Sequence, residues 1–511
     1  MAIRHARHTI DMSYYILKYD EAGMAILAEL KEAVRRGVTV RIALDTFGSG
    51  TFAGQSPLYS LIQFSKEHAG RTRNLNGLPT NRRATVQIVN FNSPLWMPIN
   101  MIRGLGRQLH NLVLKMHGAP LLEPLGYSIN RRSHDKILLI DGAFDERSIA
   151  FMGGRNVKKD YYNLNKNESK NVVDLEIMMR GVPRTEDTNS VSVGVQVQEY
   201  FDQVYFHLGN SLITRSLVGM VMGYGKTDAK MTADYERIQE KLKMNEDPDK
   251  LSESLLNEGL ENHQVEVVNT FHNLFRDQVT RKREISEHKL NVKNSRSLLV
   301  ALDKHLQNEK QEIVLVSPYL WLSPKQIRLL KRWLLQDPNR KLTLITNSIL
   351  TNNSLLSQIL IDSVVGPELM MDKGVVNREG KVVRRSISNQ VKLMEYGHAD
   401  STALGGNNVY GLLHLKGILL KGSGKAILGT YNNDPRSMLL NSEGAAVLTG
   451  SVAKEVETKI DEILANSHEY GSAEYHQIRT HPDLPLSRRI VAEKMDLLHN
   501  LIIKLKLWWL I

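Results

Sequence analysis

Two short motifs in this chain pair a histidine with a lysine two residues later. The first contains His134 and Lys136, and the second contains His414 and Lys416. Both motifs lie in apolar, strand-like runs, so each histidine and its lysine point to the same side, because side chains alternate along a strand. One such pair occurs often by chance, but two in the same sequence context indicate a common function.

The same polar residues follow both motifs in the same order. A glycine-containing turn that ends in asparagine comes first, at Asn156 after the first motif and at Asn432 after the second. An acidic residue comes next, Asp174 in the first copy and Glu443 in the second. If the two copies pack together, two imidazoles, two ammonium groups and two amides converge.

Such a cluster has the chemistry of a phosphoryl-transfer site. Cations and amide donors neutralise the phosphoryl oxygens. One imidazole can attack phosphorus while the other protonates the leaving oxygen. The carboxylates Asp174 and Glu443 can hold the second ring nitrogen of a histidine and fix its tautomer. A metal site is disfavoured, because a lysine stands beside each histidine.

These residues resemble the phospholipase D superfamily, whose signature is a duplicated H-x-K-x4-D motif followed by G-[SGT]-x-N. The first copy has every residue type, including Asp141 and the turn at 153–156, whereas the second has Lys421 where the family has aspartate. Segments around both motifs are similar to the bacterial cardiolipin synthase branch. They are NRRSHDK, GGRNVKKDYY, VVDLEI, NNDPRSMLLNSE and the C-terminal LPLSRR.

The resemblance implies a role for each motif residue. His134 would be the nucleophile that forms a phosphohistidine, and His414 the general acid and then the base. Asp141 would belong to the catalytic motif of the first copy. The phosphoryl oxygens would be held by Lys136, Lys416, Asn156 and Asn432. Asp174 and Glu443 would orient the histidines, and no metal or cofactor is implied.

The resemblance also implies a reaction. The enzyme would transfer a phosphatidyl group from phosphatidylglycerol or phosphatidylethanolamine to water or to an alcohol. Transfer to phosphatidylglycerol makes cardiolipin, and transfer to water makes phosphatidic acid. Which hydroxyl enters cannot be decided from the sequence.

Lys421 allows three interpretations. The family aspartate can be a supporting residue whose loss is tolerated. Alternatively, the extra cation lowers the pKa of His414 by like-charge repulsion. The third interpretation is a non-catalytic, membrane-associated protein whose site has decayed.

A duplicated strand–helix–strand pattern positions these motifs. Near the N-terminus the chain reads as a strand at 9–17, a helix at 23–36 and a strand at 37–45. The same order returns as a strand at 312–320, a helix at 323–335 and a strand at 341–348. This pattern predicts α/β architecture with mixed sheets.

We therefore predict two homologous phospholipase D-like α/β halves, packed about a pseudo-twofold axis, with one active site at their junction. The predicted parts are a first half at 1–215, a charged helical insertion at 216–299, a second half at 300–470 and a C-terminal tail at 471–511. Within the insertion, helical periodicity extends over 235–244 and 265–285. The insertion is interpreted as a solvated linker, with partner binding as the alternative.

The C-terminal segment 484–511 combines leucines, lysines and two terminal tryptophans. This composition favours a helix that lies in a membrane interface, and a helix docked on the core is the alternative. The strand-like run at 9–17 begins so early that we expect a preceding segment to be missing, together with any targeting signal. We expect a peripheral location on a bacterial cell membrane.

The amino-acid composition limits the kinds of binding partner and of active-site chemistry that are possible. The 511 residues carry a net charge of +11 and include no cysteine, which excludes disulfides, thiolate metal sites and a cysteine nucleophile. A basic chain favours anionic partners such as phospholipid headgroups. A phosphodiesterase that acts on nucleic acid is the alternative, although basic and aromatic residues are not interleaved in the manner that stacks bases. The oligomeric state is not predicted.

Overall fold

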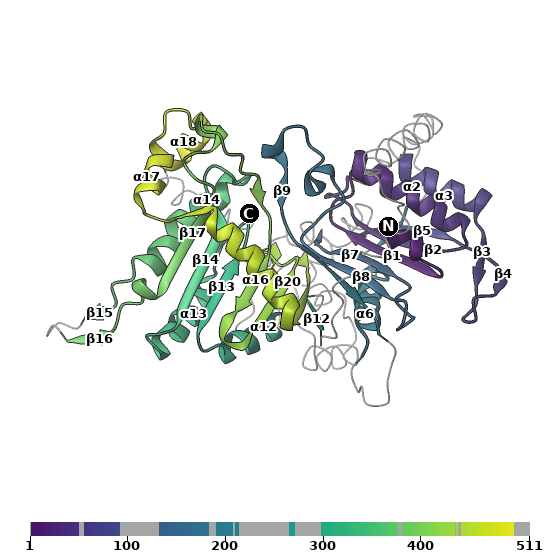
Figure 1. Ribbon diagram of the computed structural model, residues 1–511, viewed down its shortest axis with the longest axis horizontal. Coiled ribbons are helices and arrows are strands. Elements are labelled where there is room, and N and C mark those ends of the chain that lie inside the picture. The colour runs from purple at the N-terminus through teal and green to yellow at the C-terminus, as the bar shows by residue number, and fades with distance from the viewer. Residues whose placement is uncertain are drawn as a thin grey trace, which may run out of the picture.

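The computed structural model describes most of both halves. The described residues are 2–50, 56–91, 132–182, 191–207, 210–213, 265–270, 298–376, 381–434, 436–437 and 441–494. Two α/β lobes lie side by side, the N-terminal lobe in purple and blue and the C-terminal lobe in green and yellow (Figure 1).

The first lobe is built on a seven-stranded mixed sheet with the order β10-β8-β7-β1-β2-β5-β11. Its strands are β1 (Thr9–Tyr14), β2 (Thr39–Asp45), β5 (Val86–Phe91), β7 (Lys136–Ile140), β8 (Ile149–Gly153), β10 (Glu176–Arg180) and β11 (Ser211–Leu212). Its helices are α1 (Ala2–His5), α2 (Glu21–Arg35), α3 (Ser56–His68) and α6 (Val193–Tyr205). A hairpin of β3 (Arg71–Arg73) and β4 (Pro79–Arg83) projects from this lobe (Figure 1).

The second lobe is built on an eight-stranded sheet with the order β12-β22-β20-β19-β13-β14-β17-β23. Its strands are β12 (Glu266–Asn269), β13 (Glu312–Val316), β14 (Lys341–Asn347), β17 (Val391–Tyr396), β19 (Gly417–Leu420), β20 (Lys425–Gly429), β22 (Gly444–Thr449) and β23 (Ser467–Glu469). Its helices are α12 (Leu298–Asn308), α13 (Pro324–Gln336), α14 (Leu355–Leu360), a π-helix (Ile361–Met370), α16 (Gly450–Ala465), α17 (Ala473–Thr480) and α18 (Leu486–Glu493). A hairpin of β15 (Val375–Val376) and β16 (Val382–Arg384) projects from this lobe.

The two sheets repeat one topology. In each, the first strand pairs in parallel with the second, and the second with the third, as in β1-β2-β5 and β13-β14-β17. In each, the strand that follows the histidine motif pairs antiparallel with that first strand, as β7 with β1 and β19 with β13. The predicted strand–helix–strand repeats and the mixed α/β class are therefore confirmed, whereas the pseudo-twofold axis stays a prediction.

Local sequence signals explain the repeated helices. Asp20 caps α2 by accepting hydrogen bonds from the amides of Ala22 and Gly23. Ser323 begins α13 with a capping box, and Pro324 occupies the first helical turn. These caps satisfy backbone amides that have no partner within the helix, so the chain turns directly from strand into helix.

The helical reading of 265–285 is wrong at its start. Residues 266–269 form β12, which pairs antiparallel with β22 at the edge of the second sheet. Val267 and Val268 are fully buried there, and two adjacent β-branched residues suit a strand that packs on both faces. The rest of the predicted insertion, apart from 265–270 and 298–299, lies outside the described residues.

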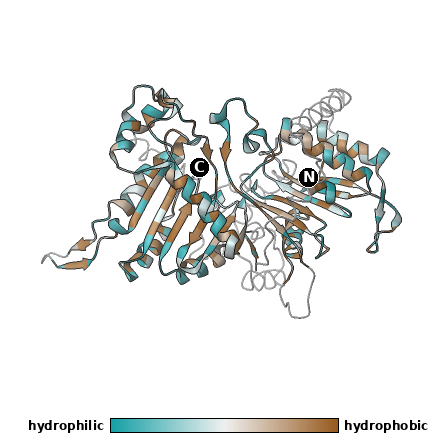
Figure 2. Ribbon diagram, in the orientation of Figure 1, coloured by the Kyte–Doolittle hydropathy of each residue, from teal (hydrophilic) through white to brown (hydrophobic). Residues whose placement is uncertain are grey.

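A shared hydrophobic core joins the lobes. It contains Leu139 and Met152 from the first sheet, Leu428 from the second, Tyr200 from α6 and Ile460 from α16. Each lobe also has a separate core under its other helices. Figure 2 shows hydrophobic residues along the strands of both sheets and hydrophilic ones on the outward sides of the helices. The lobes are thus fixed together by buried apolar surface.

Two short parallel strand pairs also cross between the lobes. β6 (Arg132–Ser133) pairs with β21 (Asn441–Ser442), and β9 (Val172–Val173) pairs with β18 (Leu412–Leu413). Each pair joins the residues just before a motif histidine to the residues just before an acidic residue of the other lobe. The amide of His134 donates to the carbonyl of Ser442, and that of His414 donates to the carbonyl of Val173.

The C-terminal part of the chain is described as far as residue 494. Of the predicted interfacial segment, α18 is therefore seen, and 495–511 lies outside the described residues. Among the residues that are described, no helix is long and apolar enough to cross a membrane.

Candidate active site

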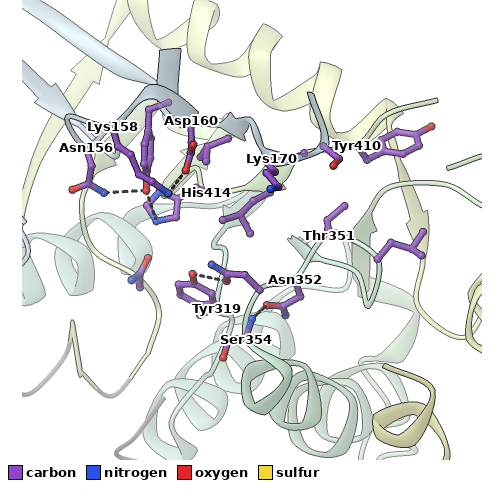
Figure 3. A pocket seen from close by; sticks show the side chains of 18 of the residues that line it. Asn156, Lys158, Asp160, Lys170, Tyr319, Thr351, Asn352, Ser354, Tyr410 and His414 are labelled. Carbon is purple, nitrogen blue, oxygen red and sulfur yellow. Dashed lines mark hydrogen bonds and ion pairs between the residues drawn. The ribbon is translucent and has the colours of Figure 1, made fainter. Parts of the chain in front are cut away.

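A cavity of about 830 Å³ lies between the lobes, and both motif histidines line it. Figure 3 shows His414 and Asn156 in this cavity. Its walls include His134, Asn156 and Tyr15 from the first lobe and His414 and Asn432 from the second. The rings of Tyr15 and His134 meet edge to face, with centroids 5.1 Å apart. The site therefore depends on both halves of the chain.

Each histidine binds a carboxylate of the opposite lobe. Nδ1 of His134 lies 2.9 Å from Oε2 of Glu443, and Nδ1 of His414 lies 2.7 Å from Oδ2 of Asp174. The sequence left open which acid serves which histidine, and the pairs prove to be crossed. With Nδ1 donating to a carboxylate, Nε2 is the nitrogen left for chemistry.

The carboxylates are held in place by further donors. Glu443 accepts hydrogen bonds from the hydroxyls of Thr430 at 2.5 Å and Ser437 at 2.6 Å, and from the amide of Asn441 at 3.0 Å. Burial raises the pKa of Glu443 to about 7 and that of Asp174 to about 6, against the pull of the lysines. Both carboxyl groups therefore change their protonation state near neutral pH.

Both motif lysines are buried within this cluster. The Nζ of Lys136 donates to the carbonyl of His134 at 2.6 Å, and the Nζ of Lys416 lies 3.0 Å from Nε2 of His414. Burial lowers the pKa of Lys136 to about 8 and that of Lys416 to about 7. An anion in the cavity would favour the charged form of both.

Burial and the neighbouring lysines lower the pKa of both histidines well below the usual value. The rings are therefore neutral at physiological pH in the absence of an anion. A neutral imidazole has the lone pair that attack on phosphorus requires.

The two motif asparagines have different surroundings. Oδ1 of Asn156 accepts from the amide of Ile16 at 3.1 Å, and its Nδ2 donates to the hydroxyl of Tyr161 at 2.9 Å. Oδ1 of Asn432 is buried and has no hydrogen-bond partner among the described residues. Such an unsatisfied amide in a cavity wall is available to a ligand.

Tyr161 was not identified as a site residue from the sequence. Its hydroxyl lies 3.5 Å from Nε2 of His414, and its ring meets the His414 imidazole edge to face. It follows the Asn156 turn within the segment GGRNVKKDYY. Its position five residues after the motif asparagine does not indicate in the sequence that it contacts His414.

Asp141 does not join the other motif residues. It stands at the opposite end of β7 from His134, about 16 Å from Lys136 along the strand. Its carboxylate accepts hydrogen bonds from the amides of Arg7, His8 and Thr9 at 2.8–3.0 Å. Asp141 therefore ties the chain before β1 to the turn after β7.

A different residue forms the equivalent link in the second lobe. Glu309, just before β13, accepts from the amides of Gly422 and Ser423 at 3.0 and 3.1 Å. Lys421 points away and forms an ion pair with Glu457 at 3.2 Å. In the first lobe the linking carboxylate lies in the turn after the histidine strand. In the second lobe it lies in the segment before the central strand. Lys421 is not among the groups that lower the pKa of His414.

No described part of the chain holds a cluster of three or more His, Cys, Asp or Glu side chains arranged to bind a metal ion. Each imidazole instead contacts one carboxylate, and Nζ of Lys416 also lies against the ring of His414.

Comparisons with known proteins show which families the chain resembles. A family model described as "Cardiolipin synthase, PLD-like domain" matches residues 1–178. Cardiolipin synthase C of Escherichia coli is 27% identical over 183 residues, which is 36% of this chain and 28% of that protein. A cardiolipin synthase of Geobacillus kaustophilus is 26% identical over 164 residues, 32% of this chain and 22% of that protein.

Over residues 1–178, the chain is similar to the phospholipase D superfamily. Within it, the chain is similar to the cardiolipin synthase branch. An uncharacterized protein of Helicobacter pylori is 20% identical over 460 residues, 89% of this chain and 74% of that protein. The phosphatidylserine synthase of Haemophilus influenzae shares the phospholipase D fold over 100% of this chain and 90% of its own, with a TM-score of 0.53 and 11% identity.

The placement of Asp141 and Glu309 predicts a shared structural role. Replacing either with alanine leaves two or three backbone amides without their acceptor, so we expect a loss of about 1–3 kcal/mol in the free energy of unfolding. Urea denaturation measures this. Lys421→Ala is the matched control, and it should change stability by less than about 1 kcal/mol because its ion pair is exposed. Full stability of Asp141→Ala with loss of activity would contradict this placement.

The lowered pKa of Lys416 predicts pH-dependent anion binding. Its ammonium group is charged below about pH 7 and neutral above, so sulfate should bind several-fold more weakly as the pH rises from about 6 to 8. Glu443 gains negative charge over the same range and acts in the same direction. Lys416→Arg keeps its charge and should reduce the slope, whereas Lys454→Arg, on the exposed face of α16, should not. Isothermal calorimetry measures the affinity, and an unchanged slope in Lys416→Arg would exclude Lys416 as the titrating group.

Proposed function

We propose that this chain transfers a phosphatidyl group from one phospholipid to a hydroxyl group through a phosphohistidine intermediate. The observation that supports it most directly is the pair of crossed histidine–carboxylate contacts at one cavity. The cardiolipin synthase and phosphatidylserine synthase similarities support phospholipid phosphatidyl transfer in general.

In the first step, Nε2 of His134 attacks the phosphorus of a bound phosphodiester. A P–N bond forms, the bond from phosphorus to the headgroup oxygen breaks, and that oxygen takes a proton from Nε2 of His414. The bound anion raises the pKa of His414, so the ring can hold this proton. Lys136, Lys416 and the two asparagine amides stabilise the charge on the phosphoryl oxygens.

In the second step, His414 acts as the base. It removes the proton from an incoming hydroxyl, whose oxygen attacks phosphorus while the P–N bond breaks. Water gives phosphatidic acid, and the hydroxyl of phosphatidylglycerol gives cardiolipin. The assignment of attack to His134 follows the family resemblance, and the reverse assignment would use the same groups.

The surroundings of Lys421 argue against a decayed site. The interpretation of a non-catalytic protein rested on this departure from the family motif. Lys421 lies at the far end of β19, and Glu309 makes the backbone contacts that Asp141 makes in the first lobe. Both histidines and both motif asparagines line the cavity, and Lys136 and Lys416 are buried beside the histidines.

The histidine roles predict different behaviour for two variants. With phosphatidylglycerol and phosphatidylethanolamine vesicles, His134→Ala and His414→Ala should each reduce turnover by at least about 10³-fold. His414→Ala should accumulate phosphate on His134, because attack survives better than release, and His134→Ala should accumulate none.

Lipid mass spectrometry measures cardiolipin and phosphatidic acid, and acid-labile phosphate on the protein measures the intermediate. The exposed His68→Ala is the control and should retain full activity. Unchanged turnover in either motif variant would refute the mechanism. Cleavage of DNA in place of lipid would favour the nucleic-acid alternative.

We further propose that the C-terminal segment binds the membrane surface. Truncation of 496–511 should weaken binding to anionic vesicles at least about tenfold, since the segment contributes leucines, lysines and tryptophans suited to an interface. Cleavage of a short-chain, monomeric phospholipid should change by less than twofold. Vesicle co-sedimentation and the soluble assay measure the two effects. Equal loss of both would indicate a helix docked on the core.

A further inference from the structure

Two arginines in the cavity wall have no part in the phosphoryl chemistry described above. Arg132 comes from the first lobe, on β6, and Arg436 comes from the second lobe, four residues after Asn432. Both line the cavity together with His134. Like the histidine–carboxylate pairs, this pair of cations is assembled from both lobes.

The arginines lie on the His134 side of the cavity. Arg132 precedes His134 by two residues, so the two side chains leave the backbone on the same side, about 7 Å apart. The guanidinium of Arg132 lies over the ring of Phe47, 4.3 Å from its centroid. Arg436 is close enough to lower the pKa of both His134 and Arg132.

Two carboxylates lie near these arginines: Asp45 raises the pKa of Arg132, and Arg436 lowers the pKa of Asp434. Asp45 accepts from the amides of Phe47, Gly48 and Ser133 at 2.8–3.1 Å. Asp434 accepts from the amide of Ser437 at 2.7 Å. Nε of Arg436 is buried and has no hydrogen-bond partner among the described residues. Two neighbouring cations with an unsatisfied buried donor favour an anionic ligand between them.

We propose that Arg132 and Arg436 form a second anion subsite. It binds the phosphodiester of an acceptor phospholipid while the first phosphoryl group is bound at His134 and His414. This inference rests on the proposed function. The guanidinium fork matches two phosphate oxygens, which favours arginine for such a contact. A glycerol bridge spans two phosphoryl groups over a distance comparable to that between Arg132 and His134.

The subsite selects the acceptor in the second step. When the acceptor phosphate is held by the arginines, its free hydroxyl is presented to the phosphohistidine. The new O–P bond forms, the P–N bond breaks and the hydroxyl proton passes to His414. Water and neutral alcohols lack the anchoring charge, so the arginines favour transfer to an anionic lipid over hydrolysis.

The ratio of products tests this selection. Labelled phosphatidylethanolamine serves as donor in vesicles that also contain phosphatidylglycerol, with glycerol in the buffer as a neutral acceptor. Arg436→Gln should lower the ratio of labelled cardiolipin to labelled phosphatidic acid by about tenfold, because loss of the arginine weakens transfer to the anionic lipid more than hydrolysis. Arg328→Gln, on the exposed face of α13, should leave the ratio unchanged. An unchanged ratio in Arg436→Gln, or equal loss of all products in a folded protein, would overturn the proposal.

Binding to the whole chain tests the subsite without turnover. By calorimetry, glycerol 1,3-bisphosphate should bind about tenfold more tightly than glycerol 1-phosphate, and Arg436→Gln should abolish this preference. Arg132→Lys keeps a charge near Asp45 but loses the fork, and should reduce the preference even if Arg436→Gln fails to fold.

Equal affinity of the two glycerol phosphates for the unmodified chain would overturn the subsite. Tighter binding of a dinucleotide with two phosphates would overturn its assignment to a lipid acceptor. If the unmodified chain turns over no lipid but prefers the bisphosphate, the proposed function fails and the subsite stands.

Discussion

The structure of the site depends on two short backbone pairings between the lobes. β6 with β21 and β9 with β18 fix the register that places each histidine beside the carboxylate of the other lobe. A slip of one residue would turn those side chains to the opposite face. Neither lobe alone provides a complete histidine–carboxylate pair, so formation of these pairs depends on the shared hydrophobic core that joins the lobes.

The electrostatics of the cavity follow from the same burial. Six ionisable groups are removed from water together, and burial raises the pKa of the carboxylates while it lowers that of the lysines and histidines. Neighbours of opposite charge limit the shifts of the carboxylates and lysines, whereas the lysines add to the downward shift of the histidines. A bound phosphodiester adds the negative charge that restores both ammonium groups, so substrate binding and the protonation state of the site are coupled.

The sequence was sufficient for features that have a local signature. The duplicated H-x-K motifs, the turns at Asn156 and Asn432 and the strand–helix–strand repeats all have fixed spacing, and the structure brings those motif residues to one cavity. The crossing of Asp174 and Glu443 was not predictable, because it depends on strand pairs between residues some 240–310 positions apart. Tyr161 and Glu309 were missed for the same reason. β12 was misread because Val-Glu-Val-Val also fits a helix, and only pairing with β22 decides for a strand.

In the proposed two-step chemistry, the choice of acceptor depends on groups other than the histidines, lysines and asparagines that contact the phosphoryl group. His414 can activate water and an alcohol equally well, so a transferase must hold the alcohol near phosphorus against abundant water. A charged acceptor can be held most strongly, because charge–charge attraction increases in a cavity of low dielectric. Arg132 and Arg436 provide the matching charge beside His134, each from a different lobe. The junction that assembles the histidine–carboxylate pairs therefore also assembles the two arginines of the proposed acceptor subsite.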